Sequence, residues 1–103
     1  GRQKPDVAAP GAAVTAARAY GGRVFGLYRP LAGTLGGTSA AAPHVAGVVA
    51  LIMQARPDLT ADQIRTVLCA TTQVPNAATR AWDPRLGFGI VDAAAAVAQA
   101  MTL

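Results

Sequence analysis

Apolar positions recur with helical spacing over one long stretch of the chain, from Ser39 to about Arg56. Within it, five apolar residues follow the i, i+3, i+4, i+7, i+8 pattern of one helix face: Val45, Val48, Val49, Ile52 and Met53. The opposite face carries alanines, Gly47 and Leu51 and is therefore apolar too. A helix that is apolar on every side is predicted to be buried on every side. Pro57 should end it, because the residue before a proline avoids helical backbone angles.

Two shorter helices are predicted after this one. Residues 60–63 have the pattern of a capping box, in which the Thr60 hydroxyl and the Gln63 amide satisfy each other's free backbone donors. That helix should end near Ala70, with Leu59 stapled against its first turn, and its buried face should comprise Ile64, Val67 and Leu68. Asp92 is expected to cap a last helix, from Ala93 to about Met101, with Val97 and Met101 on one side.

The remaining segments have strand or turn character. Residues 6–9 lie between two prolines and predict a short buried strand that ends in a Pro-Gly turn. Residues 23–28 have strand character, and the glycine-rich stretch 33–37 predicts a loop. A polar loop is expected over 71–85, followed by a turn and a very short strand over 87–91. Strands and helices in this order are typical of part of an α/β layer structure.

Composition narrows the class of protein. The chain has 103 residues, of which 52% are apolar and 14% charged, so a disordered chain is excluded and one domain with a large core is expected. The net charge is +4, but the nine basic residues are scattered along the sequence, so no nucleic-acid partner is expected. The longest strictly apolar run, Val45 to Met53, is about half of what spans a bilayer, so no membrane span is expected.

A single cysteine limits both disulfide and metal chemistry. Cys69 cannot form an internal disulfide or a CxxC zinc site, and we expect it to be a small packing residue. The chain opens at Gly1 rather than Met and shows no charged-then-apolar leader, which suggests an excerpt or a cleavage product.

The candidate chemistry lies between Gly36 and Gly47. This segment places Ser39 in the first turn of the long apolar helix, behind a glycine-rich approach that lets another chain come close. The free N–H groups of the helix start can stabilise an oxyanion at the same place, which suits a nucleophile for acyl transfer. The alternative is that Thr38 or Ser39 only caps the helix, and the spacing alone favours that alternative.

Three motifs resemble those of subtilisin-like serine proteases. The first is Gly37-Thr38-Ser39 followed by Pro43 and residues 45–47, the second runs from Lys4 to Gly11, and the third from Gly87 to Ala93. They occur in the family's order and together cover nearly the whole chain. The resemblance implies an α/β fold, namely the C-terminal part of a three-layer structure with a mostly parallel sheet. Residues 1–103 would then be a partial peptidase domain.

The resemblance also implies a function. It is that of a serine endopeptidase, which hydrolyses a polypeptide substrate through an acyl-enzyme, with Ser39 as nucleophile and its N–H as one oxyanion donor. The family's Asp, His and oxyanion Asn motifs precede this segment and do not occur in the chain, so the isolated chain is expected to be inactive. We expect it to pair with the N-terminal part of the same domain or with a second copy of itself. The family further implies secretion or a cell-envelope location, and no cofactor, although calcium is possible in the complete domain.

Neither His44 nor the aspartates should replace the missing base. His44 follows Ser39 by five residues on one helix, about 140° around the axis and about 7.5 Å along it, so it is expected to be structural. Ala40 stands where the family often has Met, so an oxidation-prone thioether is missing beside the nucleophile.

The competing hypothesis is a non-catalytic protein-interaction module that keeps the helices of a protease fold without its chemistry.

Overall fold

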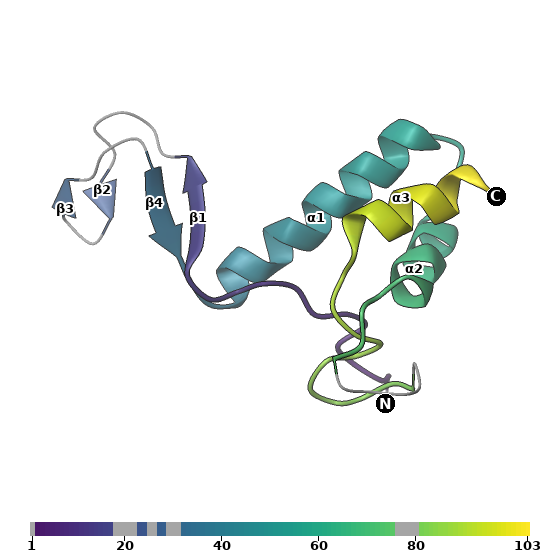
Figure 1. The fold of residues 1–103 in the computed structure, drawn as a ribbon, viewed down its shortest axis with the longest axis horizontal. Coiled ribbons are helices and arrows are strands. Elements are labelled where there is room, and N and C mark those ends of the chain that lie inside the picture. Colours follow the sequence, from purple (N-terminus) through teal and green to yellow (C-terminus); the bar gives the residue numbers. More distant parts are fainter. Residues whose placement is uncertain (1, 18–22, 25–26, 29–31, 76–80) are drawn as a thin grey trace.

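Three helices pack together at one end of the molecule and two antiparallel strand pairs project from the other (Figure 1). The computed structural model describes residues 2–17, 23–24, 27–28, 32–75 and 81–103. The elements in chain order are β1 (Val14–Ala17), β2 (Arg23–Val24), β3 (Leu27–Tyr28), β4 (Ala32–Leu35), α1 (Thr38–Ala55), α2 (Ala61–Ala70) and α3 (Ala93–Met101). This mixture of helices and strands confirms the predicted α/β class.

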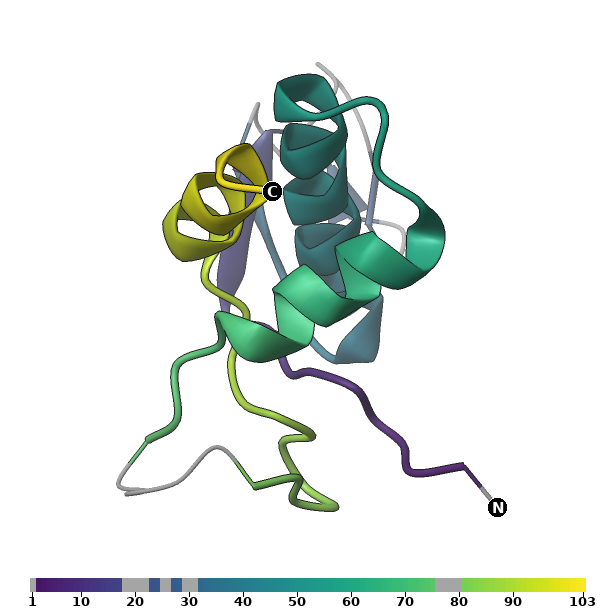
Figure 2. The ribbon, with the colours of Figure 1, turned by 90° about the vertical axis from the view of Figure 1, so that its right-hand side faces the viewer.

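The long helix α1 has the predicted bounds, but its surroundings differ from the prediction. It runs from Thr38 to Ala55, and Arg56 is its C-terminal cap. Its buried residues are Ala40, Val48 and Ile52, whereas Leu51 and Met53 are 47% and 51% exposed. The expectation of burial on every side is therefore not met within this chain. The reason is that α3 flanks α1 on one side and α2 crosses in front of it (Figure 2), which leaves the rest of its surface without a helix against it.

By length and composition α1 is the one described helix that could cross a membrane. The core helix of a soluble protein can have the same length and composition.

Helix α2 matches the prediction in its cap, its end and its buried face. The Thr60 hydroxyl accepts a hydrogen bond from the Gln63 N–H at 3.2 Å, and the Gln63 side chain accepts one from the Thr60 N–H at 2.8 Å. The helix ends at Ala70, and its buried residues are those predicted: Ile64, Val67 and Leu68. Leu59 packs against the same cluster, as the staple requires. Local sequence therefore determines this helix almost completely.

Helix α3 has the predicted bounds and cap, and its buried residues are alanines. The Asp92 carboxylate accepts a hydrogen bond from the Ala95 N–H at 2.9 Å. The fully buried residues are Ala96 and Ala100; Val97 packs against the core, whereas Met101, predicted on the same side of the helix, is 67% exposed. Alanines face the core because their small side chains allow α3 to lie close along α1.

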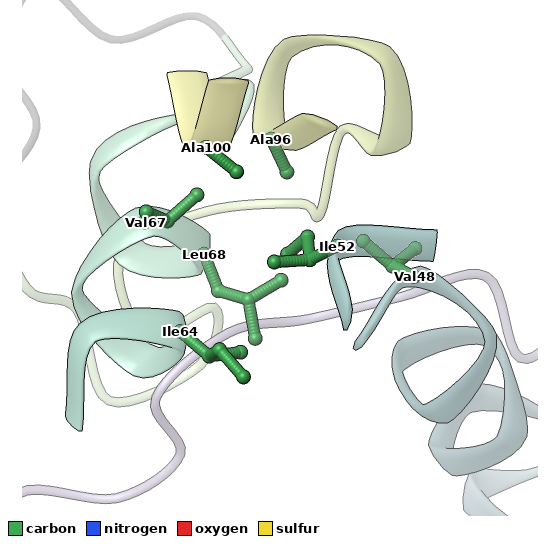
Figure 3. Close-up of a cluster of buried hydrophobic side chains, with 7 residues drawn as sticks. All are labelled: Val48, Ile52, Ile64, Val67, Leu68, Ala96 and Ala100. Atoms are coloured by element: carbon green, nitrogen blue, oxygen red, sulfur yellow. The ribbon is translucent and has the colours of Figure 1, made fainter. Parts of the chain in front are cut away.

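One apolar cluster holds the three helices together (Figure 3). Ile52 of α1 is fully buried and lies between Leu68 of α2 and the two buried alanines of α3 (Figure 3). Beside it, the Arg56 guanidinium reaches from the end of α1 to the end of α3, where it donates to the Ala100 and Leu103 carbonyls. A cation at the C-terminal ends of two helices is favoured by both helix dipoles.

The strand pairs lie in the segment before the serine. β1 pairs with β4, with Val14 opposite Leu35 and Ala17 opposite Ala32. The loop predicted over 33–37 is therefore wrong for residues 33–35, because the backbone of that glycine-containing stretch is satisfied by pairing with β1. β2 and β3 pair with each other and confirm strand character at four of the six residues of 23–28, while Phe25 and Gly26 lie outside the described residues.

The predicted strands at both ends of the chain meet each other, but only as short bridges. Ala8 forms a parallel bridge with Ile90, and Ile90 forms an antiparallel bridge with Gln73. The strand predicted over 6–9 is thus reduced to one bridging residue, and it is half-buried rather than buried. Thr72, within the predicted polar loop, is fully buried, and its hydroxyl donates to the Phe88 carbonyl at 2.6 Å. Residues 76–80 of that loop lie outside the described residues.

Candidate active site

Ser39 is the second residue of α1, and its side chain is exposed. The N-cap residue of the helix is Gly37, which has φ 83° and no side chain, so no side chain caps the helix start. The capping alternative is therefore wrong: neither the Thr38 nor the Ser39 hydroxyl caps the helix. Among the described residues, the Ser39 hydroxyl has no hydrogen-bond partner, so it remains available to an approaching group.

The backbone of the first turn leaves N–H groups beside this hydroxyl. The N–H groups of Ala40 and Ala41 donate to the Gly37 carbonyl at 3.0 and 3.3 Å. Within the part of the chain that the structure describes, the N–H groups of Thr38 and Ser39 have no acceptor. Free donors at a helix start carry a partial positive charge and suit a developing oxyanion.

A backbone contact from the second motif fixes the start of α1. The Gly37 N–H donates to the Gly11 carbonyl at 2.5 Å. A Cβ at Gly11 would lie 2.9 Å from the Gly37 oxygen and 3.4 Å from the Ala41 Cβ, so only glycine fits there without a shift. The sequence predicted a turn at Gly11 but gave no sign of this contact, because the two residues are far apart along the chain.

His44 lies one turn beyond Ser39, and its ring bonds to the helix itself. Nδ1 of His44 lies 3.0 Å from the Ala40 carbonyl oxygen, and because a carbonyl only accepts, Nδ1 carries the proton. This contact agrees with the expectation that His44 is structural rather than a base for Ser39. A hollow of about 330 Å³ borders the same turns, between α1 and β1, and its lining comprises Val14, Thr15, Ala16, Ala40, Pro43 and His44.

The third motif contacts the second. The Phe88 N–H donates to the Asp6 carbonyl at 2.8 Å, and the Ala8 N–H donates to the Gly89 carbonyl at 2.9 Å. Gly87 has φ 62°, and a Cβ there would collide with the Asp6 carbonyl oxygen. Residues 4–11 therefore lie against both the serine turn and residues 87–89, so the three motifs form one connected unit.

Comparison with known proteins shows the family to which the chain belongs. The sequence model of the subtilase family matches residues 1–89. The chain belongs to the subtilase family. Mycosin-4 of Mycobacterium tuberculosis is 44% identical over an alignment 96 residues long, and the match covers 89% of this chain and 20% of that protein. Serine protease AprX of Bacillus subtilis is 37% identical over an alignment 73 residues long, and the match covers 66% of this chain and 16% of AprX. The chain thus spans a fifth or less of these curated relatives.

Solved subtilases have the same fold over this region. The structure of fervidolysin from Fervidobacterium pennivorans, a keratinolytic enzyme related to subtilisin, aligns with a TM-score of 0.69 at 31% identity and covers 86% of this chain and 14% of its own. A protease from Pseudoalteromonas arctica aligns with a TM-score of 0.66 at 44% identity and covers 92% of this chain and 29% of its own. The prediction of a partial subtilisin-like fold is confirmed.

Among the described residues of this subtilase chain, the ion pairs centre on Asp6, Asp58 and Asp83, and none includes a residue of the serine turn. Asp6 accepts from Lys4 at 2.5 Å and from Arg65 at 2.7 Å, and these bonds, that from Arg65 foremost, lower the pKa of Asp6 to about 2. Asp58 binds the Arg56 guanidinium through both carboxylate oxygens, which lowers its pKa to about 2. The described residues contain no cluster of three or more His, Cys or acidic side chains that could hold a metal ion.

Cys69 lies apart from the serine turn. Partial burial raises the pKa of its thiol above the ordinary value, which disfavours the reactive thiolate. This agrees with its predicted role as a packing residue.

Proposed function

We propose that this subtilase chain supplies the nucleophile of a serine endopeptidase, and that Ser39 is that nucleophile. The observation that carries the proposal is the exposed, uncapped Ser39 hydroxyl at the start of α1, in a chain of a protease family. The bond broken is the scissile amide of a polypeptide. No cofactor enters the proposal, and calcium remains a possibility for the complete domain.

The reaction needs groups that lie outside these 103 residues. A serine hydroxyl attacks a carbonyl efficiently only when a base removes its proton and an acid orients that base. We propose that a His and an Asp from another segment supply both, and that a side-chain amide completes an oxyanion hole with the Ser39 N–H. The isolated chain is accordingly proposed to be inactive.

A fluorophosphonate probe tests this proposal on the natural full-length protein. Ser39 is the only serine of the chain, so a labelled serine within these residues is unambiguous. We expect one phosphonyl adduct on the peptide that contains Ser39 and none in Ser39→Ala. Thr66→Ala is the matched control, because that hydroxyl is exposed but bonds to the Asp62 carbonyl, and it should label as the parent does.

The same experiment decides between the enzyme and the second candidate. A folded full-length protein that takes up no probe would contradict the enzyme and favour the non-catalytic interaction module. The exposed apolar side chains of α1 are the observation that favours such a module.

We further propose that the exposed side of α1 is covered by the N-terminal part of the same domain, or by a second copy of this chain. Leu51 and Met53 support this, because large apolar side chains exposed on one helix indicate a contact surface. Neither a nucleic-acid partner nor a membrane span is part of the proposal. From the family we also propose a secreted or cell-envelope location.

A further inference from the structure

The turn that carries Ser39 has fewer hydrogen bonds than an ordinary helical turn. It starts at Gly37 without a side-chain cap. Four residues after Ser39 comes Pro43, which has no N–H and therefore cannot donate to the Ser39 carbonyl. The turn accordingly lacks both the usual cap and one of the bonds that tie it to the next turn.

Two contacts compensate for this loss. Ala40, directly after Ser39, is only 2% exposed, so its Cβ is fixed by packing. Its carbonyl accepts the Nδ1–H of His44 at 3.0 Å, which adds a side-chain bond between the two turns next to the position where Pro43 removes a backbone bond. The ring of His44 therefore braces the residue that follows Ser39.

We propose that His44 is a positioning residue for Ser39: its Nδ1–H, bonded to the Ala40 carbonyl, holds the uncapped, proline-weakened first turn of α1 so that the Ser39 hydroxyl keeps its place. This inference rests on the proposed function of Ser39. His44 does not touch the reacting atoms and transfers no proton. Its effect is geometric, and small displacements of a reacting group lower catalytic rates steeply.

Three variants of the natural full-length protein separate the donor from the bulk of the ring. His44→Phe keeps a planar ring without a donor. His44→Asn places an amide N–H close to the position of Nδ1, and His44→Gln places it farther out, near the position of Nε2. We expect kcat for a peptide substrate, and the rate of fluorophosphonate labelling, to fall about 10-fold or more in Phe and Gln with KM within about twofold, and to recover in Asn.

Amide hydrogen exchange provides a readout that does not depend on activity. Exchange at Ala40 and Ala41, whose N–H groups donate to the Gly37 carbonyl, should become faster in His44→Phe and His44→Gln and return to the parent rate in His44→Asn. If His44→Phe fails to fold, the comparison of His44→Gln with His44→Asn still tests the proposal.

The outcomes are distinguishable. A parent protein that labels at Ser39, with Gln and Phe variants unchanged in kcat and exchange, would overturn the role of His44 and leave the proposed function intact. Equal losses in all three variants would also overturn it, because the donor would then not be what matters. A folded parent protein that takes up no probe would overturn the proposed function and this inference together.

Discussion

Two glycines in contact determine where the candidate nucleophile lies. The Gly11 carbonyl receives the Gly37 N–H, and the space beside Gly11 is too small for a Cβ. Gly37 itself adopts φ 83°, which side-chain-bearing residues rarely do. At the scale of single residues, the position of Ser39 therefore depends on glycine, which has no Cβ, at positions 11 and 37.

Gly11→Ala should displace the start of α1 and reduce activity. The added methyl would lie 2.9 Å from the Gly37 oxygen, so the serine turn must move by a few tenths of an ångström. In the natural full-length protein we expect a loss of about 10-fold or more in kcat/KM and of about 1–3 kcal/mol in unfolding free energy, measured by kinetics and urea titration. Gly36→Ala is the control for stability, because its Cβ would meet nothing closer than 3.8 Å. An equal loss of unfolding free energy in the two variants would contradict the role given to the Gly11–Gly37 contact.

Asp6 makes stability depend on pH at the acidic end. Its folded pKa is about 2 against an ordinary 3.8, so its contribution is present above about pH 4 and is lost as pH falls towards 2. Asp6→Asn should lower the unfolding free energy at pH 6 by up to about 1 kcal/mol, and the difference should vanish near pH 2. Urea titrations at both pH values measure it. A difference that stays constant with pH would show that the carboxylate charge is not responsible.

At the scale of elements, the close approach of α3 to α1 depends on alanine. Ala96 and Ala100 are fully buried against a cluster that includes Val48 and Ile52. Larger side chains such as Met101 point away from this contact. The separation of the two helices is thus set by the smallest side chains between them.

Ala100→Leu should overpack this contact. Extra methylenes in a filled core cost about 1–3 kcal/mol, so the midpoint of urea unfolding should fall. Ala98→Leu adds the same group at an exposed position of the same helix and should change stability by less than about 0.5 kcal/mol. If both variants unfolded at the same denaturant concentration, the packing described for α3 would be contradicted.

Helix bounds followed from the sequence because their signals are local. The capping box at Thr60 and the carboxylate of Asp92 each act within three residues, so both caps were predictable. The β1–β4 pairing was missed, because it joins residues about twenty positions apart and glycine in β4 resembled a loop. The serine motif indicated Ser39, but the Gly11–Gly37 contact that fixes its place is non-local and could only be seen in the structure.

At the scale of the whole molecule, the three motifs form one unit while α1 keeps an exposed apolar side. Residues 4–11 join the serine turn to residues 87–89 through backbone hydrogen bonds. This arrangement explains how motifs far apart in sequence can belong to one connected unit. It also leaves Leu51 and Met53 without cover among the described residues.

Leu51→Asp tests whether this side is covered in the natural full-length protein. In this chain Leu51 is half exposed, so a charge there should cost little unless another segment lies over it. If α1 is covered, the buried charge should lower the unfolding free energy by more than about 2 kcal/mol. Ala98→Asp, exposed on α3, should cost well under about 1 kcal/mol. Equal small effects would contradict the proposed covering of α1.

The proposed function requires that Ser39 forms a covalent bond to the acyl group of the substrate. The most direct measurement is acid quenching of the natural full-length protein during turnover of an activated ester, followed by mass spectrometry of the peptides. We expect to find the acyl group on the peptide containing Ser39, and we expect Ser39→Ala neither to trap it nor to turn over at more than about a hundredth of the parent rate. Turnover with the acyl group on any other residue, or undiminished turnover by Ser39→Ala, would contradict it.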